Sequence, residues 1–310
     1  MILLIVLVGA YGYASVMAYD AVSVTAAKCD GRFAENTPAA FDTSPVDASA
    51  YLMPEFEDET IPSRDPGIAL SAWFVPADDG NRGPAVIVVH GHNSCKREGR
   101  ILLAAGMLHR HGVAVLLIDI RNHGDSSVPN GRFAGGTREY RDVLGAWDWL
   151  VAVQGFAPDH IGLYGQSLGA ATVLIATGEE PRIAATWEDS SYADLDVAVQ
   201  AELSRRNLPT LLRFGGYLVA RLHGDDPTSL SPLGAIAKLH GRPIFITHGD
   251  ADERLSVGYA SDLAAAVRAN GGTVEPWIVA GARHVEAILL RPAEYERRLD
   301  AFFDGALGAP

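Results

Sequence analysis

The chain has 310 residues, which is enough for one large α/β domain or two small ones. Its hydrophobic content of 48% and charged content of 20% are typical of a globular protein. The net charge of −13, with no run rich in Lys or Arg, argues against the binding of nucleic acid or of anionic lipid headgroups by electrostatic attraction.

The first segment of the chain is apolar. Residues 1–19 contain no charged side chain, and an apolar helix of about 20 residues can cross a bilayer. We expect residues 1–27 to form an N-terminal membrane anchor or a signal-like helix, with a buried core helix as the alternative. The basic start of a secretory signal peptide is missing, although small residues at 14–18 keep cleavage and secretion open. Lys28 and Arg32 weakly favour a cytoplasmic body, and the side of the membrane stays open.

A linker is expected at residues 28–54, where Pro38, Pro45 and Pro54 interrupt any regular period. It contains Cys29, and the chain has one other cysteine, Cys95. Two cysteines are too few for a disulfide scaffold and lack the spacing of a metal site. We expect Cys95 to be a small packed residue rather than a nucleophile.

Residues 55–310 alternate extended and helical patterns and are expected to form one domain. A turn signal at 64–67 separates extended segments at 56–62 and 68–76, which predicts an antiparallel hairpin, and a second turn is expected at 78–83. Buried strands are predicted at 84–89, 113–120, 161–164, 184–188, 243–247 and 274–279. Helices are predicted at 97–111, 138–154, 170–178, 258–270 and 292–303. This alternation predicts an α/β fold, in which helices cover both faces of a mostly parallel sheet and antiparallel strands form one edge.

Residues 165–169 read Gly-Gln-Ser-Leu-Gly and join a predicted strand directly to a predicted helix. This context forces Ser167 onto a tight turn with its Oγ exposed. Strand and helix come so close there that a Cβ at Gly165 or Gly169 would collide with neighbouring backbone. Because such a motif also arises by chance, the neighbouring strand ends must decide its meaning.

Polar residues follow each of the six buried strands. They lie at 90–94, 121–126, Ser167, 189–191, 248–252 and 280–284. The carboxyl ends of parallel strands meet at one edge of a sheet, so these residues are expected to converge. A serine, an acid and a histidine arrive in the order Ser, Asp, His, which is the chain order of the α/β-hydrolase triad.

At these positions the chain resembles the α/β-hydrolase-fold serine hydrolases, and most of all the serine aminopeptidase-like, prolyl-oligopeptidase-like and Bem46-like esterase group. The resemblance spans roughly residues 55–303. The matching motifs are His90-Gly91, Asp119-x-Arg121-x-His123-Gly124-x-Ser126, Gly165–Gly169, His248-Gly249-x-x-Asp252 and Gly281-x-x-His284.

The resemblance and the chemistry together imply a catalytic triad. Ser167 would be the nucleophile, and His284 would take its proton and later give it to the leaving group. Asp252 matches the family position of the acid that orients the imidazole. Asp189 is the alternative acid, because some members of this fold carry the acid one strand earlier. Asp250 and Glu253 are expected to be solvated loop charges.

Two backbone N–H groups would form the oxyanion hole, one from Leu168 and one from His92. Triad chemistry implies no cofactor. A metal site at His90 and His92, with His123 and Asp125, is disfavoured because no other ligand pair completes a known set. We expect His90, His123 and Arg121 to stabilise loops instead.

Residues 191–242 separate two core strands by more than a simple connection needs and carry apolar residues at helical spacing. We expect a small helical cap that lines a pocket for an apolar part of the substrate, with an ordinary helix and a long linker as the alternative.

The sequence therefore predicts a serine hydrolase that cleaves carboxylic esters through an acyl-enzyme. A serine peptidase or a thioesterase would use the same triad and remains open. A non-catalytic binding protein of the same fold is the remote alternative, since it would have no reason to retain Ser167, Asp252 and His284. The expected partners are a small-molecule ester or peptide and a membrane, with no nucleic acid. The natural substrate and the oligomeric state are not predicted.

Overall fold

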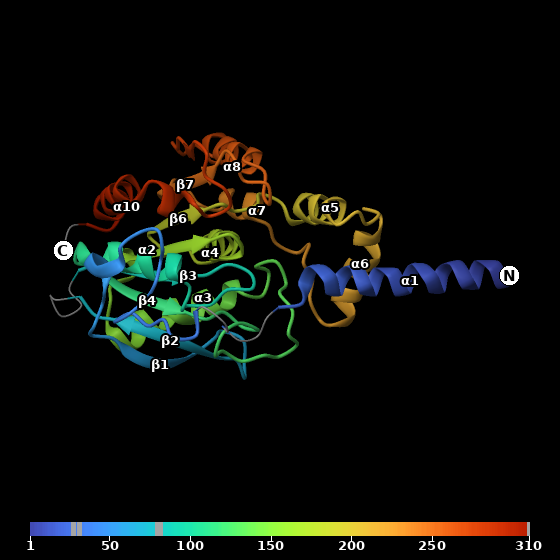
Figure 1. Ribbon diagram of the computed structural model, residues 1–310, viewed down its shortest axis with the longest axis horizontal. Coiled ribbons are helices and arrows are strands. Elements are labelled where there is room, and N and C mark those ends of the chain that lie inside the picture. Colours follow the sequence, from blue (N-terminus) through green and yellow to red (C-terminus); the bar gives the residue numbers. More distant parts are fainter. Residues whose placement is uncertain (26–28, 30–32, 78–82, 309–310) are drawn as a thin grey trace.

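The computed structural model describes residues 1–25, 29, 33–77 and 83–308 (Figure 1). Lys28, Arg32 and all but the last residue of the turn expected at 78–83 lie outside the described residues. At the centre of the molecule is an eight-stranded sheet with the strand order β1-β2-β4-β3-β5-β6-β7-β8. The sheet carries helices on both faces, as predicted.

The first two strands form the predicted antiparallel hairpin at one edge. β1 (Glu57–Pro62) pairs with β2 (Ala69–Val75), and Gly67 takes a φ of +78° in the turn between them, a conformation that glycine adopts without a Cβ clash. β2 pairs antiparallel with β4 (Ala114–Ile118). The remaining pairs are parallel and join β4, β3 (Ala85–Val89), β5 (Ile161–Gln166), β6 (Ala185–Asp189), β7 (Ile244–Gly249) and β8 (Trp277–Val279).

The last strand, predicted at 274–279, begins at Trp277 in the structure, three residues after its predicted start. Pro276 has no backbone N–H to donate to a neighbouring strand, and the ladder with β7 starts directly after it, at Trp277. The strand end that precedes His284 is nevertheless at Val279, as expected.

Alternating side chains of the central strands pack into two apolar layers. Val86 and Val88 of β3 face α2 (Gly99–Arg110) and α10 (Pro292–Leu307), whereas Ile87 and Val89 face α3 (Tyr140–Trp149). α4 (Leu168–Glu179) follows Ser167 and packs beside α3. The other elements are η2 (Ala48–Tyr51), the π-helical turn η3 (Leu150–Gln154), η4 (Pro158–His160), α7 (Pro232–Ile236), α8 (Gly258–Ala269) and α9 (Ala287–Leu290).

The insertion between β6 and β7 contains two helices that stand apart from the sheet, α5 (Leu195–Arg205) and α6 (Leu212–Leu222), which we call the cap. α7, in the same insertion, packs against α4 and α8 instead. The N-terminal helix α1 (Ile2–Ser23) projects from the body of the molecule, and α6 lies against its side (Figure 1). Among the described residues, α1 is the helix long and apolar enough to cross a membrane.

Cys29 and Cys95 form a disulfide that spans 66 residues of sequence. Cys95 is fully buried, as expected, but the expectation that it is a simple packed thiol is wrong. The spacing of two cysteines along a chain does not reveal whether the fold brings their Cα atoms together, here to 5.8 Å. The disulfide ties Cys29, six positions after the last residue of α1, to the loop after β3.

Candidate active site

Ser167 occupies the sharp turn between β5 and α4 with φ 55° and ψ −117°, an unfavourable conformation for a residue with a Cβ. A Cβ at Gly165 would lie 2.4 Å from the carbonyl oxygen of Gly169, and one at Gly169 would lie 2.4 Å from that of Val89. Both glycines are therefore required sterically, as predicted. The backbone N–H of Ser167 donates to the carbonyl of Asp189, which fastens the turn to β6.

Ser167, His284 and Asp252 form a continuous hydrogen-bond relay. The Nδ1 atom of His284 lies 2.7 Å from Oδ2 of Asp252, and its Nε2 atom lies 2.8 Å from Oγ of Ser167. An ionised carboxylate only accepts hydrogen bonds, so Nδ1 carries the ring proton and Nε2 can accept the proton of the Ser167 hydroxyl. Three residues separated by up to 117 positions in sequence thus meet at the carboxyl edge of the sheet.

The Asp252 side chain is fully buried and is held on both oxygens. Oδ1 accepts the backbone N–H groups of Arg254 and Leu255. Oδ2 accepts from His284 and also lies 3.2 Å from Nε2 of His248. Burial alone would raise the pKa of Asp252, but the hydrogen bonds from His248 and His284 outweigh burial and hold the pKa well below its usual range. Asp252 is therefore a carboxylate at neutral pH.

His248 also belongs to the site. The sequence places it in a motif but predicts no role for it. Its side chain is buried, and Nε2–H donates to the carbonyl of Leu255 at 3.0 Å while facing Asp252. Burial lowers the pKa of His248, but Asp252 and Glu188 outweigh burial, so the pKa lies above its ordinary value. The two imidazoles of His248 and His284 therefore contact the same oxygen, Oδ2 of Asp252.

The alternative acid, Asp189, is used elsewhere. Its carboxylate accepts the hydroxyls of Ser190 and Tyr295, each at 2.8 Å. Burial raises the pKa of Asp189, so the ionised form that a triad acid needs is disfavoured there. Of the two candidate acids, the structure brings Asp252 and not Asp189 into hydrogen-bond contact with His284. Asp250 accepts the N–H of Gly281, and Glu253 lies exposed.

The loop after β3 lies directly beside Ser167. A Cβ added to Gly91 would meet the Ser167 Cβ at 3.2 Å and the Gln166 carbonyl at 3.3 Å. His92 and Leu168 both line the pocket that contains Ser167. The His92 ring also has a role that the sequence did not indicate, because it packs against Phe133 and its Nε2 lies 3.3 Å from the carbonyl of Val24, directly after α1. Burial lowers the pKa of His92 to about 4, so the ring is neutral at pH 7.

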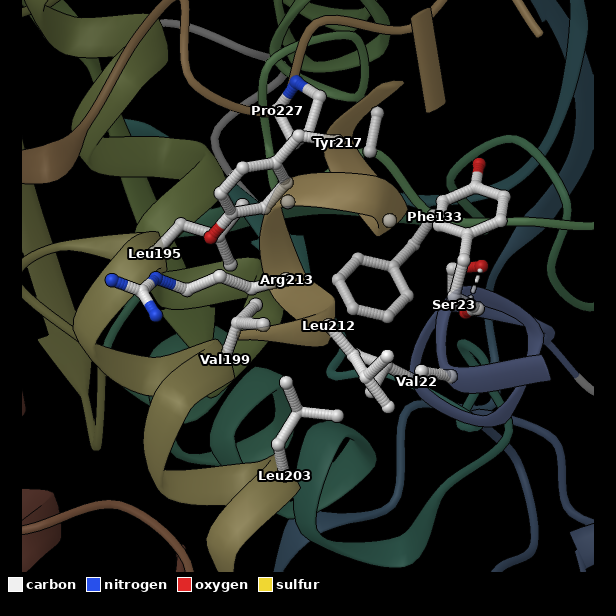
Figure 2. Close-up of a pocket in the computed structure, with 15 residues that line it drawn as sticks. Val22, Ser23, Phe133, Leu195, Val199, Leu203, Leu212, Arg213, Tyr217 and Pro227 are labelled. Atoms are coloured by element: carbon white, nitrogen blue, oxygen red, sulfur yellow. Dashed lines mark hydrogen bonds between the residues drawn. The ribbon is translucent and has the colours of Figure 1, made fainter. Parts of the chain in front are cut away.

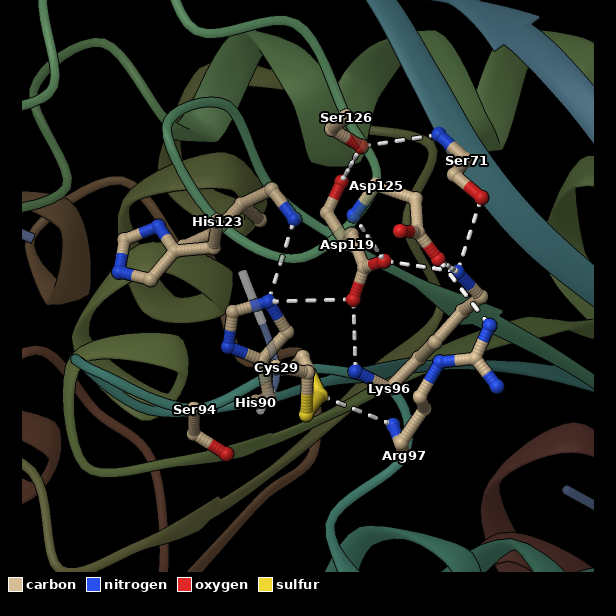
Figure 3. A network of polar contacts seen from close by, with 12 residues as sticks. Cys29, Ser71, His90, Ser94, Lys96, Arg97, Asp119, His123, Asp125 and Ser126 are labelled. Atoms are coloured by element: carbon tan, nitrogen blue, oxygen red, sulfur yellow. Dashed lines mark hydrogen bonds and ion pairs between the residues drawn. A yellow bond between two sulfur atoms is a disulfide. The ribbon is translucent and has the colours of Figure 1, made fainter. Parts of the chain in front are cut away.

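A buried polar network supports this loop (Figure 3). Asp119 accepts both the backbone N–H and the Nζ of Lys96, each at 2.7 Å, and the two side chains are almost completely buried. His90 bonds the Gly91 carbonyl through Nδ1 and accepts the Ile120 N–H on Nε2. With both ring nitrogens used by backbone, His90 stabilises the loop, as expected.

The loop after β4 is held in a similar way. Arg121 is buried and pairs with Asp142 and Asp65, each at 2.6 Å. His123 bonds the carbonyl of Arg121 through Nδ1. These contacts account for the charged residues that follow β4 without a metal ion, and Asp125 pairs with Arg97 and Lys96.

The pocket above Ser167 has a volume of about 130 Å³. Its walls come from the loop after β3, the cap and the end of α1, and they include Ala21, Val22, Val24, His92, Phe133, Leu168, Tyr192, Leu195, Ala198, Val199, Glu202, Arg206, Arg254 and Leu255. The N-terminal helix thus contributes directly to the wall of the site, which the sequence did not predict.

Residues 103–310 match the prolyl oligopeptidase family. The chain belongs to this family. An uncharacterized protein of Mycobacterium tuberculosis is 29% identical over 222 residues, which cover 72% of this chain and 71% of the relative. A thiohydrolase of Aspergillus aculeatus is 34% identical over 101 residues, which cover 33% of this chain and 31% of the relative.

Among solved structures, an esterase of Pyrococcus furiosus superposes with a TM-score of 0.67 at 22% sequence identity, over 88% of this chain and all of that one. This likeness confirms the predicted α/β-hydrolase fold. Together with the match to the prolyl oligopeptidase family, it supports a hydrolase of the α/β-hydrolase family and does not distinguish ester from peptide bonds.

Proposed function

We propose that this protein is a serine ester hydrolase in which Ser167, His284 and Asp252 act as the catalytic triad. The observation that supports this most directly is the relay from Ser167 Oγ through His284 to the buried, doubly held carboxylate of Asp252, with distances of 2.8 and 2.7 Å. Such a relay is what a serine needs to become a nucleophile near neutral pH.

In the proposed reaction, Ser167 Oγ attacks the carbonyl carbon of the ester while His284 Nε2 takes the hydroxyl proton. Asp252 stabilises the imidazolium that forms. His284 then returns the proton to the departing alcohol, leaving an acyl group on Ser167. A water molecule, deprotonated by the same imidazole, releases the acid and restores the serine.

Negative charge develops on the substrate oxygen in each tetrahedral intermediate. The backbone N–H groups of Leu168 and His92 are proposed to donate to it. Leu168 is the first residue of α4, where the unpaired N–H groups and the helix dipole favour a negative charge. Because the His92 ring is neutral at pH 7, only the backbone N–H of this residue is proposed to act on the oxyanion.

The pocket favours an ester over a peptide. A peptidase that releases N-terminal residues needs an anionic group for the substrate's amino terminus. The acidic residue in this pocket wall, Glu202, is already bonded to Arg205 and Arg206. Thioester cleavage is the second candidate, because the thiohydrolase relative shares part of this chain and the acyl-enzyme chemistry is the same.

We further propose that α1 anchors the enzyme in a membrane. Met1 and residues 2–8 of α1 expose large apolar side chains, from 58% to 98% of their surface, in a segment without charge. The disulfide between Cys29 and Cys95 favours an oxidising compartment for the body of the enzyme, against the weak indication from Lys28 and Arg32.

A fluorophosphonate probe tests the nucleophile. Wild-type protein should be labelled and should hydrolyse p-nitrophenyl esters, whereas Ser167→Ala should lose labelling and about 10⁶-fold in turnover. Ser94→Ala is the matched control, since Ser94 lies on the neighbouring loop and bonds Glu98 rather than His284. Assays beside aminoacyl-nitroanilides and acyl thioesters rank the three bond types. Ester hydrolysis that persists undiminished in Ser167→Ala would refute the assignment.

A further inference from the structure

A second, apolar cavity of about 50 Å³ lies between α1, α5 and α6 (Figure 2). Val22, Phe133, Leu195 and Val199 line this cavity and also line the pocket of Ser167. The other wall residues include Ala18, Leu203, Leu212, Gly216, Tyr217 and Pro227. The two cavities are therefore neighbours, and these four side chains form the wall that they share.

The outer face of α6 is exposed and apolar. Leu211, Phe214, Leu218 and Leu222 are 52%, 61%, 60% and 79% exposed, and their spacing of three, four and four residues puts them on one side of the helix. The opposite side carries Leu212, Gly215, Gly216 and Ala220, which are buried. An amphipathic helix with a large exposed apolar face is typical of a membrane interface.

α6 and α1 are held together at close range. The Tyr11 hydroxyl donates to the carbonyl of Leu211 and accepts the N–H of Gly215, so it is inserted into the first turn of α6. A Cβ at Gly215 would lie 2.0 Å from the Ser15 hydroxyl oxygen, which shows how closely the two helices approach. α6 crosses α1 where α1 leaves the body, and the first turns of α1 extend beyond it (Figure 1). Ten residues of the chain precede the contact at Tyr11, which is about 15 Å of helix. If this part of α1 enters a bilayer, α6 lies at the bilayer surface.

The charges around α6 indicate how it would bind lipid. Arg213 pairs with Asp196 and Arg221 pairs with Asp226, at 3.0 and 3.1 Å. The chain as a whole is strongly acidic. Binding should therefore come from apolar side chains rather than from anionic headgroups, and it should depend little on salt.

We propose that the exposed face of α6 docks on the lipid bilayer beside the inserted α1, and that the cavity beneath it receives the apolar chain of esters dissolved in that bilayer. The substrate class is then a membrane-partitioned ester with a long apolar chain. The chemistry of this step rests on the proposed serine-hydrolase function, whereas the docking of α6 does not. Both parts of the proposal, the contact of α6 with lipid and the binding of the apolar chain, follow from the way α1, α5 and α6 pack together.

Docking is tested with the full-length chain in phosphatidylcholine nanodiscs that contain brominated acyl chains. Leu218→Trp adds an indole to the exposed face, and Val153→Trp is the control. Val153 is 65% exposed and follows α3, which runs opposite to the parallel strands and so ends away from the cap. We expect the Leu218→Trp indole to be quenched several-fold more than the Val153→Trp indole, with no change at high salt. Equal quenching of both would overturn the proposal.

The second part of the proposal, the hydrolysis of long-chain esters from the bilayer, is tested with the double variant Leu218→Gln/Leu222→Gln. Hydrolysis of a soluble short-chain ester should equal wild type, and hydrolysis of a long-chain ester presented in the nanodisc should fall roughly tenfold or more. If both activities are unchanged, or if the variant alters only the oligomeric state in detergent, α6 does not dock on lipid. If wild type hydrolyses neither ester, the serine-hydrolase assignment is wrong, whereas the quenching experiment still tests the docking of α6.

Discussion

The exchange of Asp252 for asparagine separates the two candidate acids and tests the relay itself. In the wild-type site both carboxylate oxygens accept, Oδ2 from two imidazoles and Oδ1 from the backbone N–H groups of Arg254 and Leu255. An asparagine has one accepting oxygen and one NH₂ group. In either orientation, the NH₂ group faces two N–H donors, so at least two hydrogen bonds are lost.

The expected loss follows from these contacts. A buried donor left without an acceptor costs about 1–3 kcal/mol, and an exposed donor such as the Arg254 N–H costs less because water can accept its hydrogen bond. If the side chain relieves the conflict by turning its NH₂ toward His284, the ring must accept at Nδ1 and carry its proton on Nε2, where it can no longer accept the Ser167 proton. We therefore expect kcat to fall about 10⁴-fold, which corresponds to roughly 5.5 kcal/mol in the activation free energy.

The matched control is Asp189→Asn. The side-chain hydrogen bonds of Asp189 go to Ser190 and Tyr295, and within the described residues none of them reaches His284. This variant should lose stability but retain kcat within about tenfold, because the Ser167–His284 contact does not depend on its charge. Both variants are assayed with one soluble p-nitrophenyl ester, and folding is checked by circular dichroism.

A larger loss of kcat in Asp189→Asn than in Asp252→Asn, with both proteins folded, would refute the assignment of the acid. If kcat falls by less than about tenfold in Asp252→Asn, then Asp252 does not control which nitrogen of His284 carries the proton.

Two further predictions concern the cavity and the buried acid beside the site. Val199 lines both cavities, so Val199→Phe should reduce the space on both sides of their shared wall. We expect kcat/KM to fall about tenfold or more for long-chain relative to short-chain esters, and an unchanged chain-length profile would contradict this. Burial raises the pKa of Glu188 from its ordinary value of 4.5 to about 8. The folded protein thus retains a proton that the unfolded chain releases between these values, so the free energy of unfolding should fall as pH rises through this range, by at most about 5 kcal/mol. In Glu188→Gln, the free energy of unfolding measured by denaturant titration should no longer fall over this pH range. If it falls equally in wild type and in the variant, the titration of Glu188 is not the cause.

The strand ends could be predicted because each depends on a local pattern. Continuous β-branched runs identify buried strands, and the order Ser167, Asp252, His284 places the three side chains at one sheet edge once the strands are parallel. The glycines of the turn could be predicted for the same reason, since the collision they avoid is with residues four positions away or in the adjacent strand.

The remaining parts of the site depend on contacts that no local pattern reveals. His248 lies four residues before Asp252, inside a motif visible in the sequence, but the motif alone does not show that the buried ring contacts the carboxylate. The disulfide joins Cys29 to Cys95 because the segment after α1 returns to the loop after β3, which two isolated cysteines cannot reveal.

The same reasoning changes the meaning of the N-terminal helix. In sequence it reads as a detachable anchor or signal, but in the structure its last turns are built into the enzyme. Asp20 pairs with Arg132 at 2.7 Å, and the Thr25 hydroxyl donates to the carbonyl of Asn122. Val22 lines both cavities, and the Val24 carbonyl contacts His92. Cleavage near residues 14–18 would leave these contacts without the helix that orders them and would open the cavity wall at Ala18. We therefore propose that the N-terminal helix is retained, because its removal would take away part of the wall of both cavities.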